Sequence, residues 1–142
     1  MRALAFFNGL SGALHIGLSE PAQPISPALM NRKAPPAASI TSVTLRASVF
    51  EDGGLRALTP EELDLVVLEE REVRDRGYGD VVCHVAPNGT CFRVRDLLAA
   101  IEETERQTRH QSEWFEGIDV HHTFFEGMER DPDAIWRVRW GS

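Results

Sequence analysis

Arginine and histidine side chains at alternate positions of the expected strands give this sequence its main chemical interest. Side chains of a β-strand alternate between the two faces of a sheet, so residues two apart share a face. By this pattern, six residues are expected to gather on one face: Arg46, His84, Arg93, His121, Arg137 and Arg139. Guanidinium groups bind carboxylates and phosphates through two parallel hydrogen bonds. The set therefore predicts a binding surface for an acidic protein segment or an anionic small ligand.

A catalytic use of the same region is the alternative. His121 or His84 would serve as a general base, with Cys91 as the nucleophile of a small hydrolase or transferase. No G-x-S-x-G, P-loop, H-E-x-x-H or dinucleotide-binding motif accompanies them in the sequence. His121 and His122 are adjacent, so on a strand they point to opposite faces, His122 into the core, and do not chelate one metal ion. We therefore predict no catalytic residue, no metal site and no cofactor.

The charge distribution bears on the class of partner. The chain has 142 residues and a formal net charge of −7. Residues 1–50 hold four basic residues against one acidic residue, whereas residues 51–142 hold 11 basic against 21 acidic residues. An acidic folded part argues against tight binding to nucleic acid, because the phosphates repel it. A small acidic protein without a catalytic motif is typical of an inhibitor or immunity-type protein that docks a partner. The alternative is a homo-oligomer, such as a homodimer, in which a second copy covers the face that holds these six arginine and histidine residues (the arginine-rich face).

The cysteines and the N-terminal stretch bear on the compartment. Cys83 and Cys91 do not have the paired spacing of a structural zinc site. Free thiols are typical of cytoplasmic proteins, so we expect a cytoplasmic protein. The apolar stretch at residues 1–18 is too short and too interrupted for a membrane span or a secretory signal. No membrane partner is therefore expected.

The N-terminal part differs in composition from the rest of the chain. Residues 19–36 hold five of the eight prolines and are typical of a linker. We therefore expect an N-terminal extension with a Pro-rich linker at residues 1–39 and a single domain at residues 40–142. Two interpretations of the extension stay open. In one, Met30 is the true start of the protein; in the other, the apolar stretch forms a short amphipathic helix.

Periodicity and turn residues predict two helices and about five strands in the domain. The expected elements are a strand at 40–50, a helix at 60–77 begun by a capping box at Thr59 and Glu62, a hairpin at 80–94 around Asn88-Gly89, a helix at 95–109 and a hairpin at 117–140. A two-residue turn at Asn88-Gly89 would fix a register in which Cys83 is buried and Cys91 points the other way. A disulfide between these two cysteines is therefore disfavoured.

The C-terminal hairpin is expected to have one apolar and one polar face. The residues expected to face the core are Ile118, Val120, His122, Phe124, Trp136, Val138 and Trp140. The residues expected to face outward are Asp119, His121, Thr123, Phe125, Arg137 and Arg139. Burying one large apolar side chain contributes roughly 1.5–3 kcal/mol, so the apolar set decides which face meets the core.

The order β-α-β-β-α-β-β predicts an α+β fold, with an antiparallel sheet of about five strands and two helices on one face. The first six elements match the ferredoxin-like β-α-β-β-α-β arrangement, and the C-terminal strand would extend its sheet. A cystatin-like curved sheet wrapped around a helix is the alternative. In the first arrangement, the arginine-rich face lies opposite the helices.

Overall fold

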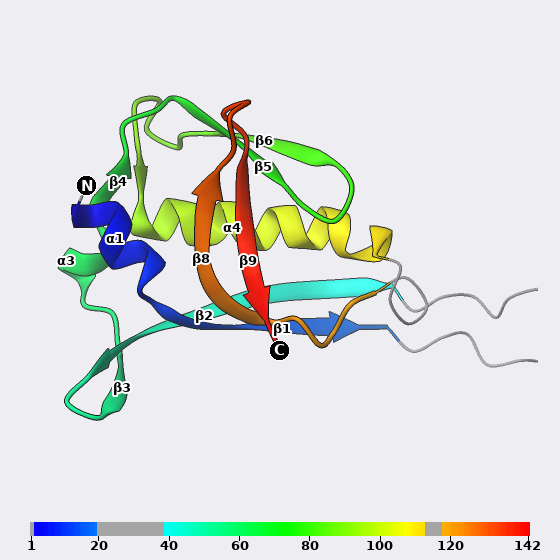
Figure 1. The fold of residues 1–142 in the computed structure, drawn as a ribbon, viewed down its shortest axis with the longest axis horizontal. Helices are drawn as coiled ribbons and strands as arrows, with labels where there is room; N and C mark the ends of the chain where they lie inside the picture. Colours follow the sequence, from blue (N-terminus) through cyan, green and yellow to red (C-terminus); the bar gives the residue numbers. More distant parts are fainter. Residues whose placement is uncertain (1, 20–38, 113–117) are drawn as a thin grey trace, which may run out of the picture.

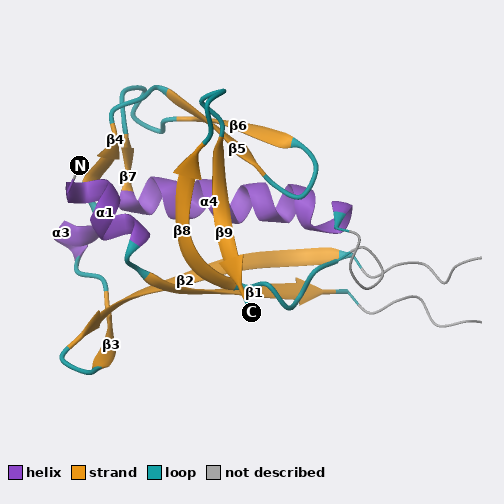
Figure 2. Ribbon diagram, in the orientation of Figure 1, coloured by secondary structure: helices purple, strands orange, loops and turns teal. Residues whose placement is uncertain are grey.

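The computed structural model describes residues 2–19, 39–112 and 118–142, and these form an α+β fold (Figures 1 and 2). The helices are α1 (Arg2–Asn8), α3 (Pro60–Leu63), α4 (Val94–Thr108) and the 3₁₀ turn η1 (Arg109–Gln111). The strands are β1 (Ser11–Leu18), β2 (Ile40–Glu51), β3 (Gly54–Ala57), β4 (Val66–Leu68), β5 (Glu72–Arg76), β6 (Val81–Val85), β7 (Phe92–Arg93), β8 (Phe124–Arg130) and β9 (Trp136–Gly141).

Seven of these strands form one sheet in the order β3-β2-β1-β8-β9-β5-β6, and β4 pairs with β7 in a second, two-stranded sheet. Strands β5 and β9 are parallel, and the other neighbouring pairs of the large sheet are antiparallel. The predicted α+β class with an antiparallel sheet is confirmed, but the sheet is larger than the five strands expected. A ferredoxin-like arrangement is not confirmed, because one long helix, rather than two, accompanies the sheet.

Helix α4 forms the centre of the molecule. Its buried side is built from Val94, Leu97 and Ile101, which follow helical spacing, and from polar residues in its second half. The backbone N–H of Arg93 donates to the Asp96 carboxylate at 2.9 Å and so closes the start of the helix. In Figure 1 the large sheet curls around α4, with β2, β8–β9 and β5–β6 on successive sides. The alternative fold expected from the sequence also had a curved sheet wrapped around a helix. Its assignment as cystatin-like stays a prediction.

The first predicted helix is correct only in its first turn. Glu62 N–H donates to Thr59 Oγ1 at 3.1 Å, and Thr59 N–H donates to Glu62 Oε1 at 2.9 Å, so the capping box is present. The helix nevertheless ends at Leu63. The following residues form β4 and β5, and β5 alternates between exposed and buried side chains with period two. β-branched residues at 66, 67 and 73 favour this extended structure.

The predicted hairpin at 80–94 is wrong. Strand β6 pairs with β5, and β7 pairs with β4. The Asn88 side chain accepts hydrogen bonds from Thr90 N–H and Cys91 N–H at 2.9 and 3.0 Å, so it closes a local turn without joining two strands. Cys83, expected in the core, is therefore exposed, and both cysteines are free thiols.

The N-terminal residues expected to be an extension contribute a strand to the sheet. Strand β1 lies between β2 and β8, so residues 11–18 and the domain expected at 40–142 share one sheet. Phe7 of α1 is buried, and its ring lies 5.4 Å from the ring of Phe125. A short helix is present, but it ends at Asn8, and the rest of the apolar stretch forms β1. Most of the expected Pro-rich linker, with Met30, lies outside the described residues.

The C-terminal hairpin is confirmed in its pairing and in its last strand. Trp136 and Val138 are buried, and Arg137 and Arg139 are exposed, as expected. The preceding strand begins only at Phe124, and a bulge between Phe125 and Met128 shifts its alternation. The expectation is wrong for four residues of this segment: Phe125 and Asp119 are buried, and Phe124 and Val120 are exposed. His122, expected in the core, is partly exposed, whereas Ile118 is buried and His121 exposed as expected.

Candidate functional site

The structure does not bring the six predicted site residues to one surface. Arg46, Arg137 and Arg139 are exposed on the side of the large sheet that faces away from the core. His84 points to the inner side, where its Nε2 lies 2.7 Å from Thr104 Oγ1 of α4. Arg93 belongs to the two-stranded sheet, at the start of α4. The sixth residue, His121, is exposed in the segment before β8.

The residues of the catalytic alternative are engaged with other groups. Cys91 Sγ accepts a hydrogen bond from Asn88 Nδ2 at 3.2 Å, and His84 is engaged with Thr104. Burial lowers the pKa of His84 below its usual value. No hydrogen bond between His84 and Cys91 is present in the described part of the chain, so these two side chains are not paired.

A cleft of about 450 Å³ lies where β5 and β9 part. These strands are paired only at Asp75–Trp136 and Arg76–Arg137. Strand β5 then ends, whereas β9 continues to Gly141 without a neighbour on that side among the described residues. The cleft is lined by Arg76, Arg137, Tyr78, Glu105, Asp119, His122 and Trp140, together with Gly77 and Val138. The cleft thus brings Arg76 and Arg137 close to the buried polar residues Glu105 and Asp119.

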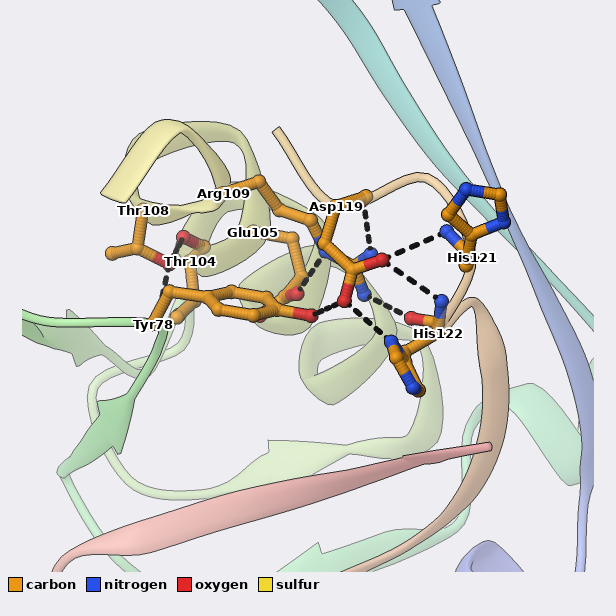
Figure 3. A network of polar contacts seen from close by, with 8 residues as sticks. All are labelled: Tyr78, Thr104, Glu105, Thr108, Arg109, Asp119, His121 and His122. Atoms are coloured by element: carbon orange, nitrogen blue, oxygen red, sulfur yellow. Dashed lines mark hydrogen bonds and ion pairs between the residues drawn. The ribbon is translucent and has the colours of Figure 1, made fainter. Parts of the chain in front are cut away.

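Asp119 is the acceptor at the centre of the polar network in Figure 3. Only 1% of its surface is exposed. Its carboxylate accepts hydrogen bonds from Tyr78 Oη at 2.5 Å, from His122 Nδ1 at 2.7 Å, and from the backbone N–H groups of His121 and His122 at 2.8 and 3.1 Å. Burial raises the pKa of Asp119, but these donors outweigh burial and hold the pKa well below its usual value. Asp119 is therefore a carboxylate at neutral pH.

Arg109 ties this network to helix α4. It is fully buried, and its Nε donates to Glu105 Oε1 at 2.6 Å. Its two terminal nitrogens donate to the backbone oxygens of Asp119 and His122 at 2.7 and 2.6 Å. Its guanidinium carbon also lies 5.1 Å from the ring centres of both Tyr78 and Trp140. Arg109 therefore fixes the segment 119–122 in place.

Two further buried acids are Glu105, which lines the cleft, and Asp75, which precedes the lining residue Arg76. Burial raises the pKa of Glu105, while Arg109 and the Trp140 side chain, which both donate hydrogen bonds to it, oppose the rise. Asp75 is also buried; burial, together with the nearby Glu105, raises its pKa to about 7. Asp75 Oδ1 has no hydrogen-bond partner within the described residues. A buried carboxyl with such a pKa is a feature of functional sites and of strained interiors alike.

The electrostatic balance of the cleft favours an anionic group. The two carboxylates that line it, Glu105 and Asp119, already receive hydrogen bonds from Arg109, Tyr78 and the backbone. By contrast, Arg76 and Arg137 form no ion pair with any carboxylate of the described ranges. Two guanidinium groups at the mouth of one cleft can bind a carboxylate or phosphate in bidentate fashion.

The sequence contained one signal for this network that alternation alone did not reveal. Glu105 lies on the buried side of α4 with Leu97 and Ile101, and Arg109, four residues later, begins the 3₁₀ turn that follows the helix. A charged pair that continues an apolar stripe indicates a buried ion pair and hence a polar interior. Tyr78 and Asp119 carried no comparable signal, because their contact joins segments that are 41 residues apart.

Comparisons with known proteins place no further constraint on the site. No family model matches this chain, and no curated protein or solved structure shows significant similarity to it. Within the described residues, no three histidine, cysteine, aspartate or glutamate side chains are grouped closely enough to bind a metal ion. None of the helices in this part of the chain has the length and apolar character needed to span a membrane.

Proposed function

We propose that this protein is a binding module that takes an anionic group, a carboxylate or a phosphate, into the cleft between β5 and β9. The observation that carries the proposal is the position of Arg76 and Arg137 at the mouth of this cleft, where neither forms an ion pair with a carboxylate of the described residues; the cross-strand neighbour Glu129 is instead paired with Arg139. Of the six residues predicted from the sequence, Arg137 is the one that lines this cleft. The anionic group belongs either to a free small ligand or to acidic side chains of a partner protein, which is the inhibitor or immunity-type case.

The buried network supports this role by holding the cleft in shape. Arg109, Glu105 and Asp119 are linked to one another and to Tyr78 by hydrogen bonds of 2.5–2.7 Å. Arg76 and Arg137 are cross-strand neighbours at the last paired position of β5 and β9. A cleft whose walls are already fixed binds with a smaller loss of conformational entropy than a mobile surface does.

Titration calorimetry with inorganic phosphate, citrate and a short polyglutamate peptide tests the proposal. A charge-assisted hydrogen bond contributes about 1.5–3 kcal/mol, so Arg76→Gln or Arg137→Gln is expected to weaken binding by roughly 10- to 100-fold. Arg46→Gln is the matched control, because Arg46 is an exposed arginine of the same sheet on β2. Binding of a free anion alone indicates a small ligand, and preferential binding of the peptide indicates an acidic partner. Equal affinities of the Arg137→Gln, Arg76→Gln and Arg46→Gln proteins would refute the proposal.

A further inference from the structure

Strand β6 forms one edge of the seven-stranded sheet. It pairs with β5 on one side, and no strand of the described residues pairs with it on the other. An edge strand presents unpaired backbone N–H and C=O groups, and proteins usually protect such edges with charged residues, proline or bulges. Strand β6 has the sequence Val-Val-Cys-His-Val, which contains none of these.

The backbone groups that point to the open side can be identified from the register. Hydrogen-bonded and non-bonded pairs alternate along an antiparallel ladder. The N–H of Ala86 donates to Arg71 O at 2.8 Å, and the N–H of Gly77 donates to Asp80 O at 2.9 Å, and these bonds flank the β5–β6 ladder. Bonded pairs therefore recur at every second position between these two ends, at 73–84 and 75–82. The pairs that contain Val81, Cys83 and Val85 lie between them and are non-bonded. The N–H and C=O groups of these three residues therefore point away from β5.

The side chains of the same three residues are exposed on one face. Val81, Cys83 and Val85 are all exposed, and Val85 is the most open of them, at 71%. The two valines lie at equal distances on either side of Cys83. The strand is therefore symmetric about Cys83 in its exposed side chains and in its outward backbone groups.

The opposite edge of the sheet has a different character. Strand β3 contains Arg56, which forms ion pairs with Glu51 and Glu62 at 3.0 and 2.8 Å. A charged side chain held in place on an edge strand discourages pairing with another strand. Only the β6 edge thus combines an uncharged strand with an open ladder among the described strands of the large sheet.

We propose that β6 pairs antiparallel with β6 of a second copy of this chain, on a two-fold axis at Cys83. In that register Cys83 faces Cys83 of the second copy, and Val81 faces Val85 of the second copy. Each of the three pairs brings two outward N–H and two outward C=O groups together, which makes six backbone hydrogen bonds. The exposed valines and cysteines form one continuous apolar row, and two seven-stranded sheets join into one.

Charges on the neighbouring strands are compatible with this pairing. On β5, Arg76 lies beside Val81 and Glu72 lies beside Val85, so each of the two outer rows across the dimer has opposite charges at its two ends. The central row has Arg74 at both ends. These two arginines are separated by three strand spacings, or about 14 Å, which exceeds the Debye length of about 8 Å at physiological ionic strength. A self-complementary strand of this kind fits a second copy better than an unrelated partner.

The mass in solution and a thiol cross-link test the inference on the full chain. Light scattering is expected to give the mass of two chains. In a Cys91→Ser protein, a short bismaleimide is expected to join Cys83 of one chain to Cys83 of the other. In a Cys83→Ser protein, cross-linking is expected to be lost, because Cys91 lies outside β6.

An edge substitution separates β6 pairing from other contacts. In Val81→Lys with Val85→Lys, the lysines of the two copies would face each other and repel. The variant is expected to be a monomer with an unchanged circular dichroism spectrum. Phe50→Lys is the matched control, since Phe50 is exposed at the β2–β3 edge, and it is expected to leave the dimer intact. A monomeric native mass over the whole concentration range would overturn the inference. So would a dimer that survives the paired lysines, or equal cross-linking through Cys91.

Discussion

Arg109 places a positive charge in the interior, where Glu105 and two backbone oxygens accept its hydrogen bonds. Removing one partner of a buried ion pair leaves the other charge uncompensated, at a cost of about 3–5 kcal/mol. We therefore expect Arg109→Met to lower the free energy of unfolding by about that amount in urea titrations. Arg106→Met is the matched control in the last turn of α4, because Arg106 and its partner Glu103 are partly exposed, and it is expected to leave the free energy of unfolding close to the native value.

A double variant separates the charge from the packing. Glu105→Leu with Arg109→Met removes both charges, so part of the stability lost in Arg109→Met should return. If Arg109→Met is no more harmful than Arg106→Met, Arg109 does not hold the segment 119–122.

Asp75 is expected to make stability depend on pH. Its pKa is raised from 3.8 to about 7 by burial and by Glu105, so the folded state holds a proton that the unfolded state releases. Stability from this group is complete below about pH 4, falls as the pH rises, and is lost above about pH 7. Asp75→Asn keeps the side chain neutral at every pH. The variant should match the native protein near pH 4 and exceed it above pH 7, by up to about 4 kcal/mol.

Thermal or urea unfolding across this pH range measures the effect. Asp133→Asn, at an exposed position in the β8–β9 turn, should follow the native curve at every pH. A constant difference between Asp75→Asn and the native protein would show that Asp75 does not titrate in this window.

The residues of the cleft were only partly predictable from the sequence. Alternation along the last strand correctly placed Arg137 on the exposed side. The same rule placed Asp119 outward, but residues 118–120 have no strand assignment, and four donors draw the carboxylate inward. Those donors come from Tyr78 and from a local turn. Periodicity describes regular elements, so it gives no information on an irregular segment held by long-range hydrogen bonds.

At the scale of elements, local signals were reliable where neighbouring residues decide the structure. The capping box at Thr59 predicted the start of a helix, and the apolar stripe at 97–101 predicted the buried face of α4. Both features are present. The Asn88-Gly89 pair also makes a turn, yet the strands beside it pair elsewhere, with β5 and β4. Pairing between strands depends on the whole sheet. A short turn motif therefore predicts that the chain bends without fixing which strands meet.

Gly77 directly follows β5 and lines the cleft. A Cβ at this residue would lie 1.9 Å from Thr108 Oγ1 and 2.6 Å from Thr108 Cβ on α4. Gly77→Ala is therefore expected to push β5 away from α4 and to lower the free energy of unfolding by about 1–3 kcal/mol. The substitution should also weaken anion binding, because Arg76 and Tyr78 flank this residue.

Gly54→Ala provides the comparison for this prediction. A Cβ at Gly54 meets no atom within 4 Å, so stability and binding should both stay close to native values. Calorimetric unfolding and titration of the two variants under the same conditions measure both effects. A Gly77→Ala protein as stable as Gly54→Ala would mean that β5 and α4 are not packed this closely.

At the scale of the molecule, β1 connects the two parts of the large sheet. Strands β3 and β2 lie on one side of it, and β8, β9, β5 and β6 lie on the other. A chain that starts at Met30 lacks β1 together with Phe7, Leu10 and Leu14 of the core. Fully burying each large apolar side chain contributes roughly 1.5–3 kcal/mol, and total stabilities are only about 5–15 kcal/mol. We therefore expect the shortened chain to have no cooperative unfolding transition in calorimetry or in urea.

Adding back a peptide of residues 2–19 distinguishes loss of the strand from nonspecific damage. The peptide carries α1 and β1, so it should restore a cooperative transition whose midpoint rises with peptide concentration, because binding to the folded state stabilises it by mass action. A peptide with Leu10→Asp and Leu14→Asp, whose substitutions place charges in the core, should have no effect. If the chain from Met30 unfolds cooperatively at the native midpoint without the peptide, β1 is dispensable and the sheet forms from residues 40–142 alone.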